Sequence, residues 1–115
     1  MQPKYVGSGT RYSKAVIHGS TVYLAGNVAR DPGPTAAEQA RMILSQIDET
    51  LALCGIDKSH LLTATIVFAD MRDFDAVNEV WDAWVLPDHL PTRTPIEARL
   101  VTSRHLVAIQ VTAAL

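Results

Sequence analysis

An arginine between two prolines is the residue of this sequence with the clearest chemical use. Arg93 lies in the stretch LPTRTPIEAR, whose β-branched residues are typical of a strand, although Pro91 and Pro95 each remove a backbone donor from it. A planar guanidinium is the best bidentate partner for a carboxylate. Arg93 could therefore anchor a ligand carboxylate, or it could form a salt bridge at an interface.

Other site chemistry finds little support in the residue types. The histidines have no ligand spacing such as i, i+4, so we expect no metal site, and we expect no cofactor. The single cysteine, Cys54, falls at the end of a predicted helix, where nothing would lower the pKa of its thiol. We interpret Cys54 as a small hydrophobic residue.

Length and composition narrow the class of protein. A chain of 115 residues that is 48% hydrophobic fits one domain over 1–115 with one core. A net charge of −2 with scattered basic residues argues against nucleic acid as a partner. The sequence has no apolar run of membrane-spanning length and no secretory signal, and with one cysteine it fits a reduced compartment, so we expect a cytoplasmic protein away from membranes.

Two segments have the 3.6-residue period of an amphipathic helix. The first, PTAAEQARMILSQIDETLALCG, begins with a T-x-x-E capping box at Thr35 and ends at Gly55. The second, DFDAVNEVWDAWV, has Asp73 as its expected N-cap. Trp81 and Trp84 recur at helical spacing in the second segment, which predicts that both are core residues.

The remaining segments alternate like strands. The segments SKAVIHG and STVYLAGNVA flank a Gly19–Ser20 turn and predict a hairpin. The run LLTATIVFAD predicts a strand buried on both faces, and TPIEARL with HLVAIQVTAAL predicts a second hairpin. The order β-β-α-β-α-β-β predicts an α+β two-layer sandwich, in which one mixed sheet carries both helices on one face.

The last strand predicts what covers each face of the sheet. One set of alternate residues is strongly apolar and should lie under the helices: Val107, Ile109, Val111, Ala113 and Leu115. The other set is too apolar for water and too polar for a dry core: Leu106, Ala108, Gln110, Thr112 and Ala114. A face of this kind usually packs against another subunit. We therefore predict an oligomer with the sheets turned inward.

Four motifs, in order and at the right spacing, resemble the RidA/YjgF family of reactive-intermediate deaminases, and especially its short bacterial YoaB-type members. RYSKAVIHGSTVYLAGNVA is similar to the opening hairpin of the family and ends near Gly26. DMRDFDAVNEVWDAW, PTRT and LVAIQVTAAL are similar to its D-x-x-D-F signature, its P-x-R-(S/T/C) motif and its terminal V-E-I strand. The resemblance extends over nearly the whole chain.

This resemblance implies a homotrimer with a chorismate-mutase-like fold and three clefts between subunits. It implies hydrolysis of enamines or 2-imino acids to 2-keto acids and ammonia. Arg93, followed by Thr94, would hold the substrate carboxylate, and Gly26 would let the backbone approach the ligand. Tyr12 would line the cleft of a neighbouring subunit, unless it is a half-buried hairpin residue. Asn78 matches the signature asparagine, but it could instead bond nearby backbone.

Two positions depart from the family pattern. Ala108 stands where the family has a glutamate that orients or activates water, and the loss of such a group typically costs ~10²–10⁴-fold in rate. Pro95 stands where the family uses a backbone N–H to bind the carboxylate. A shift of two residues would put Gln110 at the glutamate position. We expect the Arg93 guanidinium beside the Ala108 methyl group, in a pocket walled by two copies of the chain.

Glu97 could replace the missing acid, although an ion pair with Arg99 or Arg104 is the simpler expectation. The leading hypothesis is a trimer that binds a small carboxylated metabolite and has weak or no deaminase activity. The alternative is a non-catalytic trimer for metabolite sensing or protein interaction. A different reaction in the same cleft, with a base supplied by the substrate, is a third hypothesis.

Overall fold

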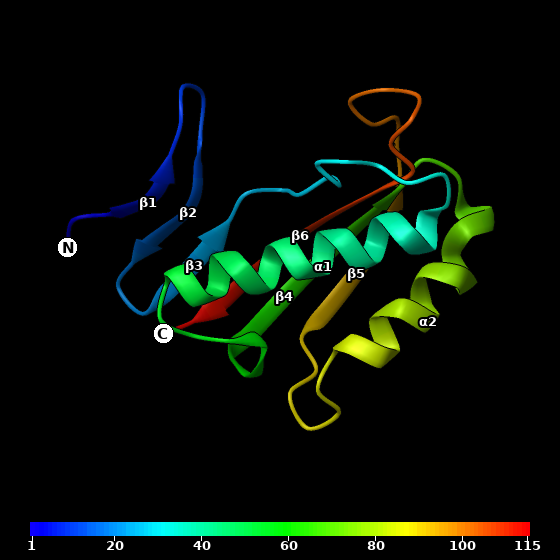
Figure 1. The fold of residues 1–115 in the computed structure, drawn as a ribbon. Helices are drawn as coiled ribbons and strands as arrows, with labels where there is room; N and C mark the ends of the chain where they lie inside the picture. Colours follow the sequence, from blue (N-terminus) through cyan, green and yellow to red (C-terminus); the bar gives the residue numbers. More distant parts are fainter.

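The computed structural model describes residues 1–115 as one six-stranded mixed sheet with two α-helices on one face (Figure 1). The strands are β1 Lys4–Ser8, β2 Ser13–His18, β3 Thr21–Leu24, β4 Leu61–Phe68, β5 Thr92–Glu97 and β6 Val107–Ala114. The helices are α1 Ala36–Leu53 and α2 Phe74–Trp84, with one-turn 3₁₀ helices at Lys58–His60 and Met71–Asp73. The predicted α+β class is confirmed. Neither α-helix has the length and apolar character needed to cross a membrane.

The strand order β1-β2-β3-β6-β4-β5 corrects the predicted C-terminal hairpin. β5 and β6 do not pair with each other: β5 lies parallel to β4 on one side, and β6 lies antiparallel to β4 on the other. The connection 98–106 is long enough to pass the end of β4 and return on its far side. β6 thereby gains two pairing partners in the middle of the sheet, where an apolar strand is best covered.

The N-terminal hairpin is confirmed, and an additional strand precedes it. β2 and β3 pair antiparallel around Gly19, which has a φ of +63° in the turn. β1 was not predicted, and it forms the outer edge of the sheet against β2. β1 is only five residues long and contains Gly7, which has a φ of +64°. It has too little alternation of apolar and polar residues to be recognised as a strand from the sequence.

Both ends of α1 follow the sequence signals. The Thr35 hydroxyl oxygen accepts a hydrogen bond from the Glu38 backbone N–H at 3.2 Å, as a helix cap requires. At the other end Gly55 has a φ of +78°, and the N–H groups of Gly55 and Ile56 donate to carbonyls of the last turn at 3.0 and 3.1 Å. This is the Schellman arrangement, in which glycine avoids the strain of a left-handed residue.

The helix α2 packs beside α1 through its tryptophans. Trp81 is 4% exposed and belongs to the core, as predicted. Trp84 is only half-buried, and its indole N–H donates to Asp48 of α1 at 3.0 Å. Asp73 occupies the N-cap position of α2, but its side chain makes no capping hydrogen bond. The position of this cap was predicted correctly, and its hydrogen bond was not.

The core lies between the sheet and the helices, and one face of the sheet remains open. Four of the predicted inner residues of β6 are at most 1% exposed: Val107, Ile109, Val111 and Ala113. The fifth, Leu115, lies beyond the end of the strand and is 51% exposed. β4 was predicted to be buried on both faces, but within one chain only its helix side is buried. We call the other side the open face, and it includes Thr63, Thr65, Val67, Thr94, Ile96, Ala108, Gln110 and Thr112.

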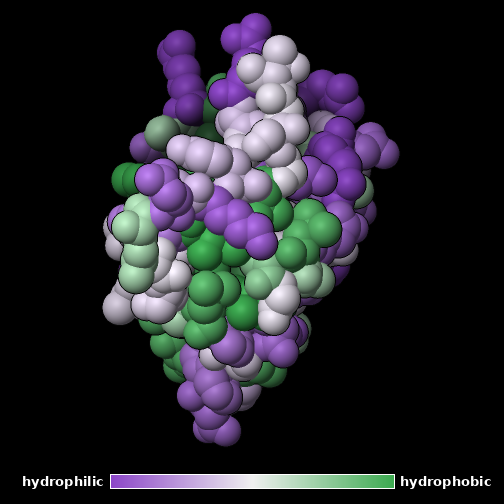
Figure 2. Space-filling model, turned by 90° about the vertical axis from the view of Figure 1, so that its left-hand side faces the viewer, coloured by the Kyte–Doolittle hydropathy of each residue, from purple (hydrophilic) through white to green (hydrophobic).

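The surface also shows hydrophobic side chains outside the core. Seen from the side of the molecule that carries β1 and β2, a hydrophobic area lies in the middle and hydrophilic residues border it (Figure 2). Exposed large hydrophobic side chains occur on the sheet as well, including Tyr5, Tyr23 and Ile96. Contiguous apolar surface of this kind is typical of proteins that bind a partner.

Candidate functional site

The side chain of Arg93 lies on the helix side of β5, beneath α2. Arg93 pairs with Ala64 of β4, whose side chain is buried under the helices. The guanidinium carbon lies 5.6 Å from the ring centroids of both Phe74 and Trp81. One guanidinium nitrogen, Nη2, donates to the amide oxygen Oδ1 of Asn78. Asn78 therefore bonds the site arginine and not nearby backbone, and α2 holds the guanidinium in one orientation.

No carboxylate of the chain neutralises this guanidinium. The two ion pairs of the chain lie elsewhere, at Arg30–Glu49 and Arg72–Asp70. Partial burial lowers the pKa of Arg93, and the Asp82 carboxylate opposes that shift. The guanidinium remains charged at neutral pH, because arginine is not deprotonated in proteins. The guanidinium has five N–H donors, and Asn78 accepts from one of them. The site is therefore a half-buried cation that can donate further hydrogen bonds to a ligand.

The residues that follow Arg93 alternate between the two faces of the sheet. Pro95 is on the same side as Arg93, and Thr94 points to the open face opposite Thr65. β5 is the edge strand of the sheet, which is where a proline without an N–H is tolerated. Within one chain, the Thr94 side chain therefore does not share a site with the guanidinium.

The expected ion pair of Glu97 is not formed. The Glu97 carboxylate accepts a hydrogen bond from the backbone N–H of Met71 at 2.8 Å, and it makes no ion pair with Arg99 or Arg104. Backbone N–H groups at the start of a helix lack partners, and a carboxylate satisfies one here. Glu97 thus ties β5 to the turn before α2, and its role as a replacement acid gains no support.

Ala108 lies on the open face, opposite Val67 of β4. Arg93 and Ala108 consequently point to opposite faces of the sheet, and their pairing partners on β4 are three residues apart. A single chain does not place the guanidinium beside this methyl group. Gln110, the alternative at the glutamate position, donates its amide N–H groups to the carbonyls of Leu24 and Val111 at 3.1 and 3.2 Å.

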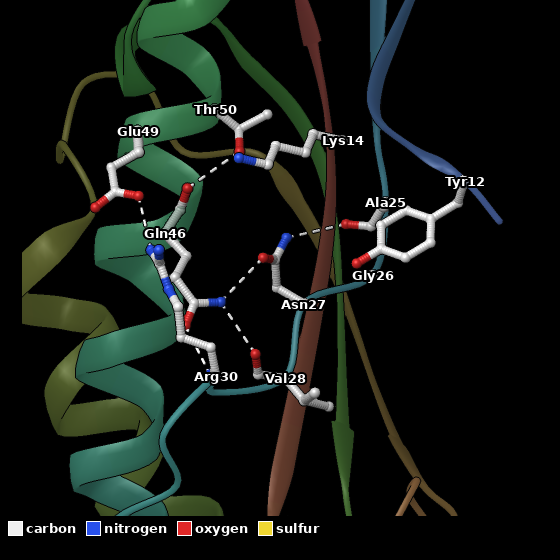
Figure 3. A pocket seen from close by; sticks show the side chains of 10 residues that line it. All are labelled: Tyr12, Lys14, Ala25, Gly26, Asn27, Val28, Arg30, Gln46, Glu49 and Thr50. Atoms are coloured by element: carbon white, nitrogen blue, oxygen red, sulfur yellow. Dashed lines mark hydrogen bonds and ion pairs between the residues drawn. The ribbon is translucent and has the colours of Figure 1, made fainter. Parts of the chain in front are cut away.

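Tyr12 and Gly26 lie together at a second place, a cavity of about 280 Å³ between α1 and the segment after β3 (Figure 3). We call it the Tyr12–Gly26 cavity. Its lining is completed by Lys14, Ala25, Asn27, Val28, Arg30, Gln46, Glu49 and Thr50. The Tyr12 side chain is 68% exposed, so it is not a half-buried hairpin residue. A Cβ atom added at Gly26 would meet nothing within 4 Å, so the chain itself does not explain this glycine.

Gln46 of α1 builds the wall of this cavity, and sequence reasoning missed it. Its amide oxygen accepts from the Arg30 N–H at 3.0 Å, and its NH₂ group donates to Asn27 Oδ1 and the Val28 carbonyl at 3.1 and 3.0 Å. Gln46 is 8% exposed and interrupts the apolar face of α1. A buried amide must find hydrogen-bond partners, so a glutamine on the apolar face of the predicted helix was the signal that could have identified Gln46.

The two groups of site residues stand on different sides of one chain (Figure 1). Arg93 and Asn78 belong to β5 and α2, whereas Tyr12 and Gly26 belong to the region of β2 and β3. β6 and β4 lie between β3 and β5, and three strand spacings amount to about 14 Å. A small ligand can contact both groups only if a second copy brings its β5 edge to the Tyr12–Gly26 cavity of the first.

Comparison with known proteins gives relatives along the whole chain. A family model described as Endoribonuclease L-PSP matches residues 4–115. The RutC family protein YoaB of Escherichia coli is 40% identical over 109 residues, which are 95% of each chain. A crystal structure of a YjgF family member from Neisseria meningitidis superposes with a TM-score of 0.96 at 45% identity and covers 99% of this chain and 95% of that chain.

A more distant relative has a named activity. The 2-iminobutanoate/2-iminopropanoate deaminase of Rattus norvegicus is 28% identical over 105 residues, which are 86% of this chain and 76% of the rat protein. The predicted resemblance to YoaB-type proteins is confirmed by the matches at about 40% identity. The chain therefore belongs to the Endoribonuclease L-PSP family, also called RidA/YjgF, and is similar to its YoaB-type members.

Proposed function

We propose that this protein binds a small 2-keto or 2-imino acid and that the Arg93 guanidinium anchors the ligand carboxylate. The observation that carries the proposal is a half-buried guanidinium with no carboxylate partner in the chain. Removing a charge from water is costly unless a partner compensates it. Asn78 and two aromatic rings hold the guanidinium in place. Its remaining N–H groups can bind a carboxylate through two parallel hydrogen bonds.

The binding unit in this proposal is a homotrimer with clefts between neighbouring copies. The separation of Arg93 from Tyr12 and Gly26 supports it, because only a neighbouring copy could complete the site. Such a contact joins two different surfaces, and a heterologous contact closes into a ring when its rotation permits. The open face and the exposed hydrophobic surface provide area for such packing.

The reaction class follows from the relatives. Hydrolysis of a 2-imino acid by water yields a 2-keto acid and ammonia, and the substrate carboxylate would rest on Arg93. The methyl group of Ala108 can neither accept a proton nor hold a water molecule. We therefore expect a rate roughly 10²–10⁴-fold below that of relatives with a glutamate there.

The test measures ammonia release from 2-iminopropionate generated in situ. We expect a low rate for the unmodified protein and a higher rate for Ala108→Glu, alone or with Pro95→Cys. Adding Arg93→Ala to the activated variant should remove the gain. A rate for the unmodified protein close to that of ordinary relatives would refute the proposed weak activity. A gain that survives Arg93→Ala would refute the anchoring role.

A non-catalytic metabolite sensor is the second candidate, and the methyl group at Ala108 favours it. A thermal-shift screen of 2-keto acids separates binding from chemistry, with Arg93→Ala as the comparison. A sensor would show shifts that depend on Arg93 and no ammonia release even in Ala108→Glu. If no carboxylate raises the melting temperature through Arg93, both candidates fail.

A further inference from the structure

We infer that the ligand carries a second anionic group and that Lys14, in the Tyr12–Gly26 cavity, binds it. The inference rests on the proposed function, since Arg93 of a neighbouring copy would supply the first anchor. It adds a substrate class: 2-keto or 2-imino acids with a carboxylate or a phosphate at their far end.

The cavity has few polar groups that are free to meet a ligand. Figure 3 shows the amides of Gln46 and Asn27 bonded to each other and to backbone carbonyls, and the Thr50 hydroxyl donating to the Gln46 carbonyl at 3.2 Å. Arg30 and Glu49 form an ion pair at 2.7 Å. These contacts build the wall of the cavity, and Glu49 balances the charge of Arg30, although the Arg30 guanidinium keeps further N–H donors.

Two polar side chains of the lining make no hydrogen bond or ion pair within the chain. They are Lys14, with three N–H donors and a positive charge, and Tyr12, with its hydroxyl group. Because the charges of Arg30 and Glu49 cancel, Lys14 leaves the cavity with a net charge of +1. A cavity with an uncompensated ammonium group favours an anionic group over a neutral or basic one.

The backbone of β1 helps to direct Lys14 into the cavity. Gly7 lies against Lys14, and a Cβ atom on Gly7 would stand 2.9 Å from the Lys14 Cδ and 3.0 Å from its Cγ. The stem of the lysine therefore lies across a place that only glycine leaves free. Figure 3 shows the side chain extending from β2 toward α1. Packing of the stem reduces the freedom that the ammonium group would lose on binding.

The test compares ligands that differ only at the far end. 2-Oxovalerate and 2-oxoglutarate both have five carbons, and a methyl group of the first is a carboxylate in the second. Isothermal titration calorimetry on the intact protein should show about fivefold tighter binding of 2-oxoglutarate, the gain typical of a partly exposed ion pair. 3-Phosphohydroxypyruvate provides the phosphate arm and shows which of the two groups is preferred.

Two lysine variants make the test specific. Lys14→Met keeps the length of the stem and removes the charge, so it should abolish the preference for 2-oxoglutarate over 2-oxovalerate. Lys4→Met makes the same change outside the cavity and should keep the preference. The inference is overturned if neither dianion binds more tightly than 2-oxovalerate, or if the preference survives Lys14→Met. Failure of the proposed function is distinct: 2-oxovalerate would then bind equally well to Arg93→Met.

Discussion

Replacing Asn78 by aspartate should change stability and ligand binding in opposite directions. The Asn78 amide oxygen accepts a hydrogen bond from the Arg93 guanidinium, and an aspartate is nearly isosteric. The variant would convert a neutral acceptor into a carboxylate, and charge-assisted hydrogen bonds are about twice as strong as neutral ones. Because the pair is only half-buried, we expect the free energy of unfolding to rise by up to about 1 kcal/mol.

Ligand binding should weaken because the guanidinium would already be neutralised. A ligand carboxylate on the free side of the guanidinium would lie roughly 6 Å from the new carboxylate, where like charges repel by about 2.8 kcal/mol at an effective dielectric constant of about 20. Partial exposure and salt screen part of this repulsion, so we expect about 1.5–2 kcal/mol. That corresponds to a dissociation constant roughly 10- to 30-fold higher.

The assay is calorimetric titration of 2-oxovalerate, with urea unfolding of the same samples. Asp82→Asn is the matched control, because it removes the carboxylate that acts on Arg93 from nearby and leaves the Asn78 hydrogen bond in place. It should strengthen binding by a small factor. Unchanged affinity in Asn78→Asp would show that the guanidinium does not hold the ligand. Lower stability would contradict the expected pairing with Arg93.

Two further predictions concern the end of α1. Gly55→Ala should lower the free energy of unfolding by about 1–2 kcal/mol, as measured by urea titration. Gly55 has a φ of +78°, and a Cβ atom there would meet no neighbour, so the cost is backbone strain alone. An unchanged free energy of unfolding would contradict this assignment. Burial raises the pKa of the Cys54 thiol, although Lys4 opposes the shift. The thiolate is the reactive form, so alkylation by iodoacetamide should be slower at pH 8 than that of a free thiol, and the pH at half-maximal rate should be higher. A midpoint below that of a free thiol would contradict the burial.

Sequence alone was sufficient for features that depend on near neighbours along the chain. The N-cap at Thr35, the stop at Gly55 and the turn at Gly19 each need only a few adjacent residues, and all three are present, although the second hydrogen bond of the predicted capping box is not formed. The alternation of β6 correctly predicted the side chains that lie under the helices from Val107 to Ala113, but not the exposed Leu115. The four motifs, in order and at the right spacing, were enough to identify the family, which the comparisons confirm.

The tertiary structure decided what depends on partners far apart in the sequence. Pairing of β4 with both β5 and β6 replaced the expected hairpin, and its register put Arg93 and Ala108 on opposite faces of the sheet. It also assigned Asn78 to the guanidinium and Gln46 to a cavity wall. Periodicity shows that a side chain points inward, but strand order and register determine which distant group it meets, because they arise from packing of the whole sheet against its helices.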